Sequence, residues 1–210
     1  MKKYSVLFFA CIAILISGCG AIKSMDGQTG RVDKSQQNDY KVLSIQGVPI
    51  QGNIHKLMRT FIAKGWSLNR NKKSKDGSIF LDGVFMGHDA QLGLMPVSPT
   101  DKNVVIAAVF IDGTHNYNSF ERLKDNYFSE MHLSILGQYE EKYGTYIHQN
   151  DVAAEYIKNA FSAVVFYHYP GLQIYAVGVP KAHSWSGRTC IVYTNRAGMD
   201  SHAQYLLDEI

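Results

Sequence analysis

A run of eight apolar residues constrains the fold more than any other stretch of the chain. Val104 to Ile111 lies between Asn103 and Asp112 and contains no polar side chain. A run of this length is short for a buried helix and is typical of a strand that is covered on both faces. We therefore expect it at the centre of a sheet.

Other segments have the length and the β-branched or aromatic content of strands. They span residues 42–45, 66–69, 78–86, 90–95, 161–169, 172–179 and 188–194. Lys72 to Gly77 and Pro170-Gly171 are predicted turns, and we expect Asp112-Gly113 to end the central strand. The Asp-Gly pairs at Asp76, Asp82 and Asp112 favour turns or bulges over ligand positions.

An amphipathic helix is predicted before these strands. Ile54, Leu57, Met58, Phe61 and Ile62 repeat with helical spacing. Asn53 suits the N-cap and Gly65 suits a left-handed C-terminal cap.

A second, longer helix is predicted from Asn118 to Tyr143. Its apolar stripe is Phe120, Leu123, Tyr127, Met131, Ile135 and Tyr139. Residues 152–159 suit a short helix or a connection, and residues 197–210 suit a C-terminal helix.

This order of elements predicts an α+β fold, with helices on one face of an antiparallel sheet. A helix ending near Gly65 precedes strands, and a helix ending near Gly144 precedes more strands. We expect a single domain over 41–210 with an internal repeat, 41–112 and 113–210, of two helix-plus-three-strand units.

The N-terminus has the layout of a bacterial lipoprotein signal. Lys2 and Lys3 precede an apolar run of eleven residues, Val6 to Ile16, which is well short of the roughly twenty that span a bilayer. Ser17 and Gly18 are small, as cleavage before a cysteine requires. We expect a signal peptide over 1–18 and acylation of Cys19, with the lipid bilayer as a partner.

Residues 19–40 are polar and predict a flexible tether, which lacks an acidic cluster after Cys19. The predicted location is the cell envelope, at the outer membrane facing the periplasm. The chain holds 21 Lys and Arg against 18 Asp and Glu, and loss of Lys2 and Lys3 leaves a charge of +1. That balance gives no reason to expect nucleic acid as a partner. Cys190, the one cysteine after the anchor, lies in an apolar run and is predicted to be buried.

Several short motifs support a resemblance. They are Gly47-Val48-Pro49-Ile50 with Gly52, Phe61 with Lys64-Gly65-Trp66, Gly83 with Gly87, Tyr139 with Lys142-Tyr143-Gly144, Cys190 to Thr194, and Leu207 to Ile210. With them the chain resembles a family of uncharacterised secreted proteins and lipoproteins from gut-dwelling Gram-negative bacteria. The resemblance implies location and fold but no activity and no site residues. The element order is also similar to tandem helix-plus-sheet modules of β-lactamase-inhibitor-like and outer-membrane-assembly lipoproteins.

No motif predicts a cofactor or a metal site. His88 with Asp89 and Asp112 with His115 lie at strand ends, but the chain has no His-x-x-x-His or Cys-x-x-Cys spacing. His183 beside Ser184, together with Asp112, is the best catalytic candidate. The alternative interpretation of His183 and Ser184 is an ordinary loop between strands, since triads are assembled in space.

Aromatic residues are the one residue class with binding potential that is enriched in this sequence, which contains 13 tyrosines. Trp66, Tyr167, Tyr169, Tyr175 and Trp185 form a candidate binding surface if they are exposed, and core packing is the alternative. Three functions stay open: a non-enzymatic module that binds an envelope protein or a small ligand, a periplasmic hydrolase, and a purely structural envelope component.

Overall fold

The computed structural model describes residues 42–127, 133–143, 147–148, 164–169, 171–195, 197–198 and 201. The predicted signal and tether, including Gly18 and Cys19, lie outside these residues. So do residues 152–159, Gly144 and most of the predicted C-terminal helix.

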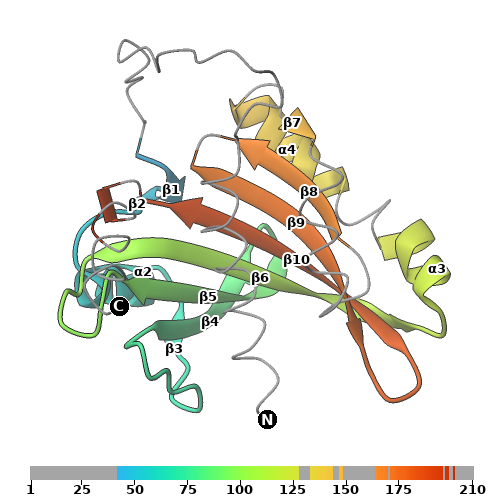
Figure 1. Cartoon of the computed structure of the whole chain (residues 1–210), viewed down its shortest axis with the longest axis horizontal. Helices are drawn as coiled ribbons and strands as arrows, with labels where there is room; N and C mark the ends of the chain where they lie inside the picture. Colours follow the sequence, from blue (N-terminus) through green and yellow to red (C-terminus); the bar gives the residue numbers. More distant parts are fainter. Residues whose placement is uncertain are drawn as a thin grey trace, which may run out of the picture.

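An antiparallel sheet of eight strands makes up most of the structure (Figure 1). Its strands are β3 (Ser67–Leu68), β4 (Ile79–Phe85), β5 (His88–Pro96), β6 (Val104–Tyr117), β7 (Ile147–His148), β8 (Val164–Tyr169), β9 (Leu172–Pro180) and β10 (Trp185–Thr194). They lie side by side in the order β3-β4-β5-β6-β10-β9-β8-β7. With the few short helices described below, this arrangement is compatible with the α+β class.

The prediction for the central strand is confirmed. Strand β6 lies between β5 and β10, and every residue from Val104 to Ile111 is buried. The prediction that Asp112-Gly113 ends this strand is wrong, because β10 continues to pair with β6 as far as Tyr117. The register shifts between Ser186 and Arg188, so the strand passes through an irregularity near Gly113 instead of turning.

The other two Asp-Gly pairs differ from each other. Gly77 has a φ of +82° in a turn where the Asp76 carboxylate accepts a hydrogen bond from the Ser78 amide, so the prediction of a turn is confirmed. Asp82-Gly83 lies inside β4, which corrects the prediction of a turn or bulge. A Cβ on Gly83 would lie 2.6 Å from the Trp66 ring, so the glycine lets that ring lie against the strand.

Helix α2 (Ile54–Ala63) forms as its sequence predicts. The Asn53 side chain accepts a hydrogen bond of 2.9 Å from the His55 amide, and Gly65 has a φ of +96° beyond the C-terminus. Ile54, Leu57 and Phe61 are buried and face the sheet. Ile62 is 42 % exposed, so the buried stripe is narrower than expected.

The predicted long helix from Asn118 to Tyr143 is described only in two separate parts. The structure has α3 (Phe120–Leu123), capped by Ser119, and α4 (Leu133–Tyr143), and residues 128–132 lie outside the described part. The apolar stripe is divided between two clusters. Leu123 and Tyr127 pack in a satellite cluster with Ala176, whereas Ile135, Leu136 and Tyr139 belong to the main core.

The main core lies between the described helices and one face of the sheet, here called the helix face. Alternate strand residues contribute to it: Leu81 and Phe85 of β4, Ala90, Leu92 and Leu94 of β5, Val109 and Ile111 of β6, and Ile191 and Tyr193 of β10. The hydroxyls of Tyr139 and Tyr193 hydrogen-bond to each other inside it. Strand alternation places Asp82, Gln91, Phe110, Asp112 and Arg188 on the opposite face.

A short hairpin precedes α2 and was missed by the sequence analysis. Strands β1 (Ser44–Ile45) and β2 (Val48–Pro49) pair across Gln46-Gly47, where both residues have positive φ. The Gln46 amide nitrogen donates to the Val84 carbonyl, and its oxygen accepts from the Trp66 indole, each at 2.9 Å. The outer edge of β4 is occupied further along by the Ser67 hydroxyl on the Asp82 carbonyl and by the Asn69 amide on the Phe80 carbonyl.

Each half of the sheet has four strands in chain order, not the predicted three. In the first half α2 precedes β3 to β6, and in the second half α3 and α4 precede β7 to β10. The two-residue strands β3 and β7 complete the outer edges: β3 corresponds to the predicted strand at residues 66–69, whereas β7 was not predicted.

Candidate functional site

The face of the sheet opposite the helix face carries a concave surface, which encloses a volume of about 900 Å³. Its lining includes charged and amide side chains from the loop before β4 and from four neighbouring strands. We call the set Lys72, Asp82, Asp89, Gln91, Asp112 and Arg188 the polar concavity.

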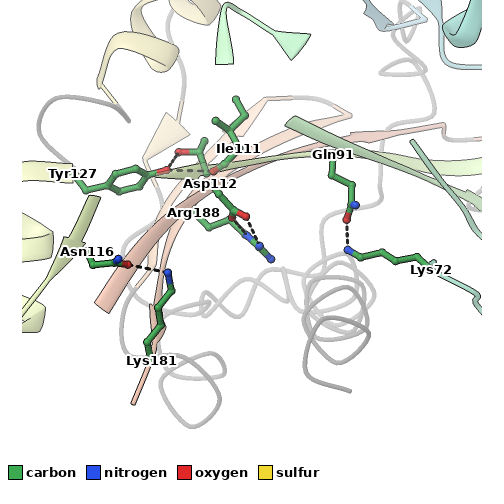
Figure 2. A network of polar contacts seen from close by, with 9 residues as sticks. Lys72, Gln91, Ile111, Asp112, Asn116, Tyr127, Lys181 and Arg188 are labelled. Atoms are coloured by element: carbon green, nitrogen blue, oxygen red, sulfur yellow. Dashed lines mark hydrogen bonds and ion pairs between the residues drawn. The ribbon is translucent and has the colours of Figure 1, made fainter. Parts of the chain in front are cut away.

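An ion pair joins the two central strands within the polar concavity. Asp112 of β6 lies directly opposite Arg188 of β10. The guanidinium donates from Nε and Nη2 to the two carboxylate oxygens, the second contact at 2.8 Å (Figure 2). The Arg188 side chain is only 11 % exposed and the Asp112 side chain is 61 % exposed. The pair therefore presents mainly its carboxylate to solvent.

A series of side-chain hydrogen bonds links β5, β4 and the loop before β4. Lys72 donates to the Gln91 side-chain oxygen, and Gln91 donates to one Asp82 oxygen at 2.9 Å. The other Asp82 oxygen accepts from Asn69 at 2.7 Å. Figure 2 shows the Lys72–Gln91 and Asp112–Arg188 pairs on the same side of the sheet.

The loop before β4 positions Lys72. The Asn69 side-chain oxygen accepts from the backbone amides of Asn71 and Lys72, at 3.1 and 3.2 Å. The Lys72 ammonium also lies 5.2 Å from the centroid of the Phe80 ring. The pKa of Lys72 is lowered overall. Burial is the largest cause and the charge of Arg188 is the second, and the carboxylates of Asp82 and Asp112 offset part of this lowering.

Asp89 has a different environment from the other carboxylates. It is exposed, and no side chain in the described part of the protein donates to it. The pairing of β5 with β6 ends at Ala90 and Ile111, and Asp89 and Asp112 are the next residues of the two strands, both of which line the concave surface. The concave surface thus holds two solvent-facing carboxylates, and the ion pair with the Arg188 guanidinium is made by Asp112.

The structure brings together some of the residues predicted at strand ends. His88, Asp89 and Asp112 all line the concave surface, whereas His183 and Ser184 do not. His183 lies in the β9–β10 loop, where the Ser184 carbonyl accepts from the Lys181 amide at 2.8 Å. Trp185 pairs with Tyr117, five residues beyond Asp112, which is roughly 16 Å along a strand. The predicted catalytic group is therefore spread along the sheet.

The aromatic surface is corrected at Trp66. Its side chain is 3 % exposed, lies edge-on to Phe61 and donates its indole N–H to Gln46, so it belongs to the core. Trp185 is partly buried and packs edge-on against Phe120, with ring centroids 5.4 Å apart. Tyr167, Tyr169 and Tyr175 lie on β8 and β9, and their side chains are outside the described part.

Lys72, Asp82, Gln91 and Arg188 were not predicted as members of a site. The signal that points to them is the polar residue at alternate positions of otherwise apolar strands, such as Asp82 within Ile79–Phe85. Cys190 is buried, as predicted. Among the described residues, no three His, Cys, Asp or Glu side chains are grouped as a metal site requires.

None of the helices in the described ranges is long and apolar enough to cross a membrane. Comparison with known proteins gives no relative for this chain: no protein-family profile, no curated protein and no solved structure matches it. The resemblance to uncharacterised envelope lipoproteins therefore stays a prediction from sequence.

Proposed function

We propose that the chain is a lipid-anchored protein of the bacterial cell envelope that binds an envelope protein or a small ligand without catalysis. The signal layout before Cys19 supports the anchor. The polar concavity supports binding, and we place the contact with the ligand there.

One observation carries the proposal. Five charged side chains line one concave stretch of sheet, and they come from β4, β5, β6, β10 and the loop before β4. Placing charges on a sheet face costs desolvation and gives little stability in return. A volume of about 900 Å³ lies within the range of small-molecule sites.

Two features favour binding over hydrolysis. Both oxygens of Asp112 are engaged by Arg188, so the carboxylate is held as an ion pair and is not directed at a histidine. Of the lining residues, His88 is the one histidine, and His183 with Ser184 lies elsewhere.

The experiment is capture of partners from native envelopes with the lipidated protein, followed by mass spectrometry. The test variant is Asp112→Ala with Arg188→Ala, which removes the ion pair without leaving a lone charge. The matched control is Glu121→Ala with Arg122→Ala on α3, where both residues are exposed and lie outside the concavity.

We expect the wild type and the control to recover the same ligand or protein, and the test variant to lose it. Recovery of nothing beyond lipid would favour a purely structural component. Equal recovery by all three proteins would place the contact outside the polar concavity.

A further inference from the structure

The register of the sheet relates its two halves by a pseudo-two-fold axis. The β4–β5 and β8–β9 hairpins both turn through two residues, within Phe85–His88 and Tyr169–Leu172. The second turn residue is a glycine with positive φ in each, +80° at Gly87 and +73° at Gly171. The two hairpins therefore have the same loop length and the same pairing beside the turn.

The axis passes between the two central strands. In the first half Gln91 pairs with Phe110, and in the second half Tyr175 pairs with Cys190. Phe110 and Cys190 also pair with each other, so each is the counterpart of the other.

This relation gives every residue of the polar concavity on these strands a counterpart in the same sheet. The counterparts of Asp82, Asp89, Gln91, Asp112 and Arg188 are Phe166, Gln173, Tyr175, Val192 and Ala108. None of the counterparts is charged. The sheet thus has its charged residues at positions whose counterparts, in the same strand arrangement, are uncharged. This difference indicates that the charges are not required for folding.

The charges of the concavity are unevenly exposed. The lining has two cations, Lys72 and Arg188, against three carboxylates, Asp82, Asp89 and Asp112. Arg188 is nearly covered, whereas Asp112 and Asp89 face solvent. A ligand that approaches this surface meets carboxylate oxygen first.

We propose that the polar concavity selects a ligand that carries an alkylammonium or guanidinium group, and that Asp89 is its main acceptor. This inference rests on the proposed function. Asp89 supplies the carboxylate that no described side chain engages, and the Asp112–Arg188 pair in the same concave surface holds a second carboxylate in place. The cationic group of the ligand would donate a charge-assisted hydrogen bond to the Asp89 carboxylate.

The first part of the test measures whether the Asp112–Arg188 ion pair is needed for the stability of the fold. In Asp112→Val with Arg188→Ala, each residue is replaced by its counterpart in the other half. We expect the melting temperature to stay within about 4 °C of the wild type, the shift that ~1 kcal/mol gives in a chain of this size. A larger fall would show that the pair is structural and would overturn the argument from symmetry.

The second arm titrates the mature lipidated chain, in neutral detergent, with tetralysine and with tetraglutamate peptides. We expect only tetralysine to bind, and Asp89→Asn to weaken it by about tenfold, as loss of one charged hydrogen bond predicts. The matched control is Glu141→Gln, an exposed carboxylate on α4. Lysine amide as a third probe separates a small amine from a polypeptide as the source of the group.

Equal binding of both peptides, or unchanged affinity in Asp89→Asn, would overturn the inference. If a partner is still captured from envelopes in that case, the proposed function stands with a different ligand chemistry. If no partner is captured, the proposed function itself fails.

Discussion

Gly187 has no Cβ, and this absence allows the Tyr127 ring to pack against the central strands. The Tyr127 ring lies against Gly187 and Gly113, and a Cβ on Gly187 would overlap the ring. We expect Gly187→Ala to lower the free energy of unfolding by about 1–3 kcal/mol, the usual cost of overpacking. Urea unfolding measures the difference.

The control for this change is Gly137→Ala in α4. No atom lies within 4 Å of the added methyl, and alanine favours the helix. We expect a gain of up to ~1 kcal/mol there. If both substitutions destabilise equally, the close approach of the Tyr127 ring does not control packing at Gly187.

Tyr127 also predicts how stability depends on pH. Its hydroxyl lies 3.0 Å from the Thr189 hydroxyl, and burial raises its pKa above the ordinary 10.0, against a lowering by the Thr189 hydrogen bond. Above pH 10 the unfolded chain loses this proton while the folded chain keeps it, so stability falls as the pH rises. We expect Tyr127→Phe to cost ~1 kcal/mol at pH 7 and to lose less stability than the wild type between pH 10 and 11.

The measurement is urea unfolding of both proteins from pH 7 to 11. Parallel curves over the whole range would show that Tyr127 ionises equally in the folded and unfolded states.

The sequence indicates Asp112 as a site residue, but not the partners that the sheet gives it. Arg188 lies opposite Asp112 only because β6 and β10 are neighbours, although 76 residues separate the two in the chain. Lys72 reaches the same surface because Asn69 shapes its loop. Contacts of this kind depend on strand order and register, which periodicity does not contain.

At the scale of the element, the start of α2 gives a direct prediction. Replacement of Asn53 by alanine removes the acceptor for the His55 amide, and we expect a loss of about 1 kcal/mol. Asn53→Asp keeps an acceptor and is the matched control. Thermal unfolding of the two variants measures the difference, and equal melting temperatures would show that the cap adds no stability.

The strands and α2 could be predicted because their patterns are local. The apolar run of β6 and the positive φ of Gly65 follow from residue types alone. The assignment of the stripe from Leu123 to Tyr139 to two separate clusters could not be predicted, because its helical spacing is the same throughout. The β1–β2 hairpin was missed because Gln46 takes a positive φ that is usual for glycine or asparagine.

At the scale of the whole molecule, the anchor gives the clearest prediction. We expect Cys19→Ser to abolish incorporation of labelled fatty acid and to move the protein from the membrane fraction to the soluble fraction, because a serine hydroxyl cannot form the thioether. Fractionation with radiolabelled palmitate measures both effects. An unlabelled protein that stays with the membrane in both forms would contradict the proposed lipid anchor.

The occupied edge of β4 affects how copies of this protein behave when they are crowded together. Sheets whose outermost strand is open can extend from one molecule to the next and grow into fibrils. Here the carbonyls of Phe80, Asp82 and Val84 are already taken by groups of the same chain. A neighbouring copy therefore cannot extend the sheet by bonding to these three carbonyls, and high local density does not by itself lead to aggregation through β4.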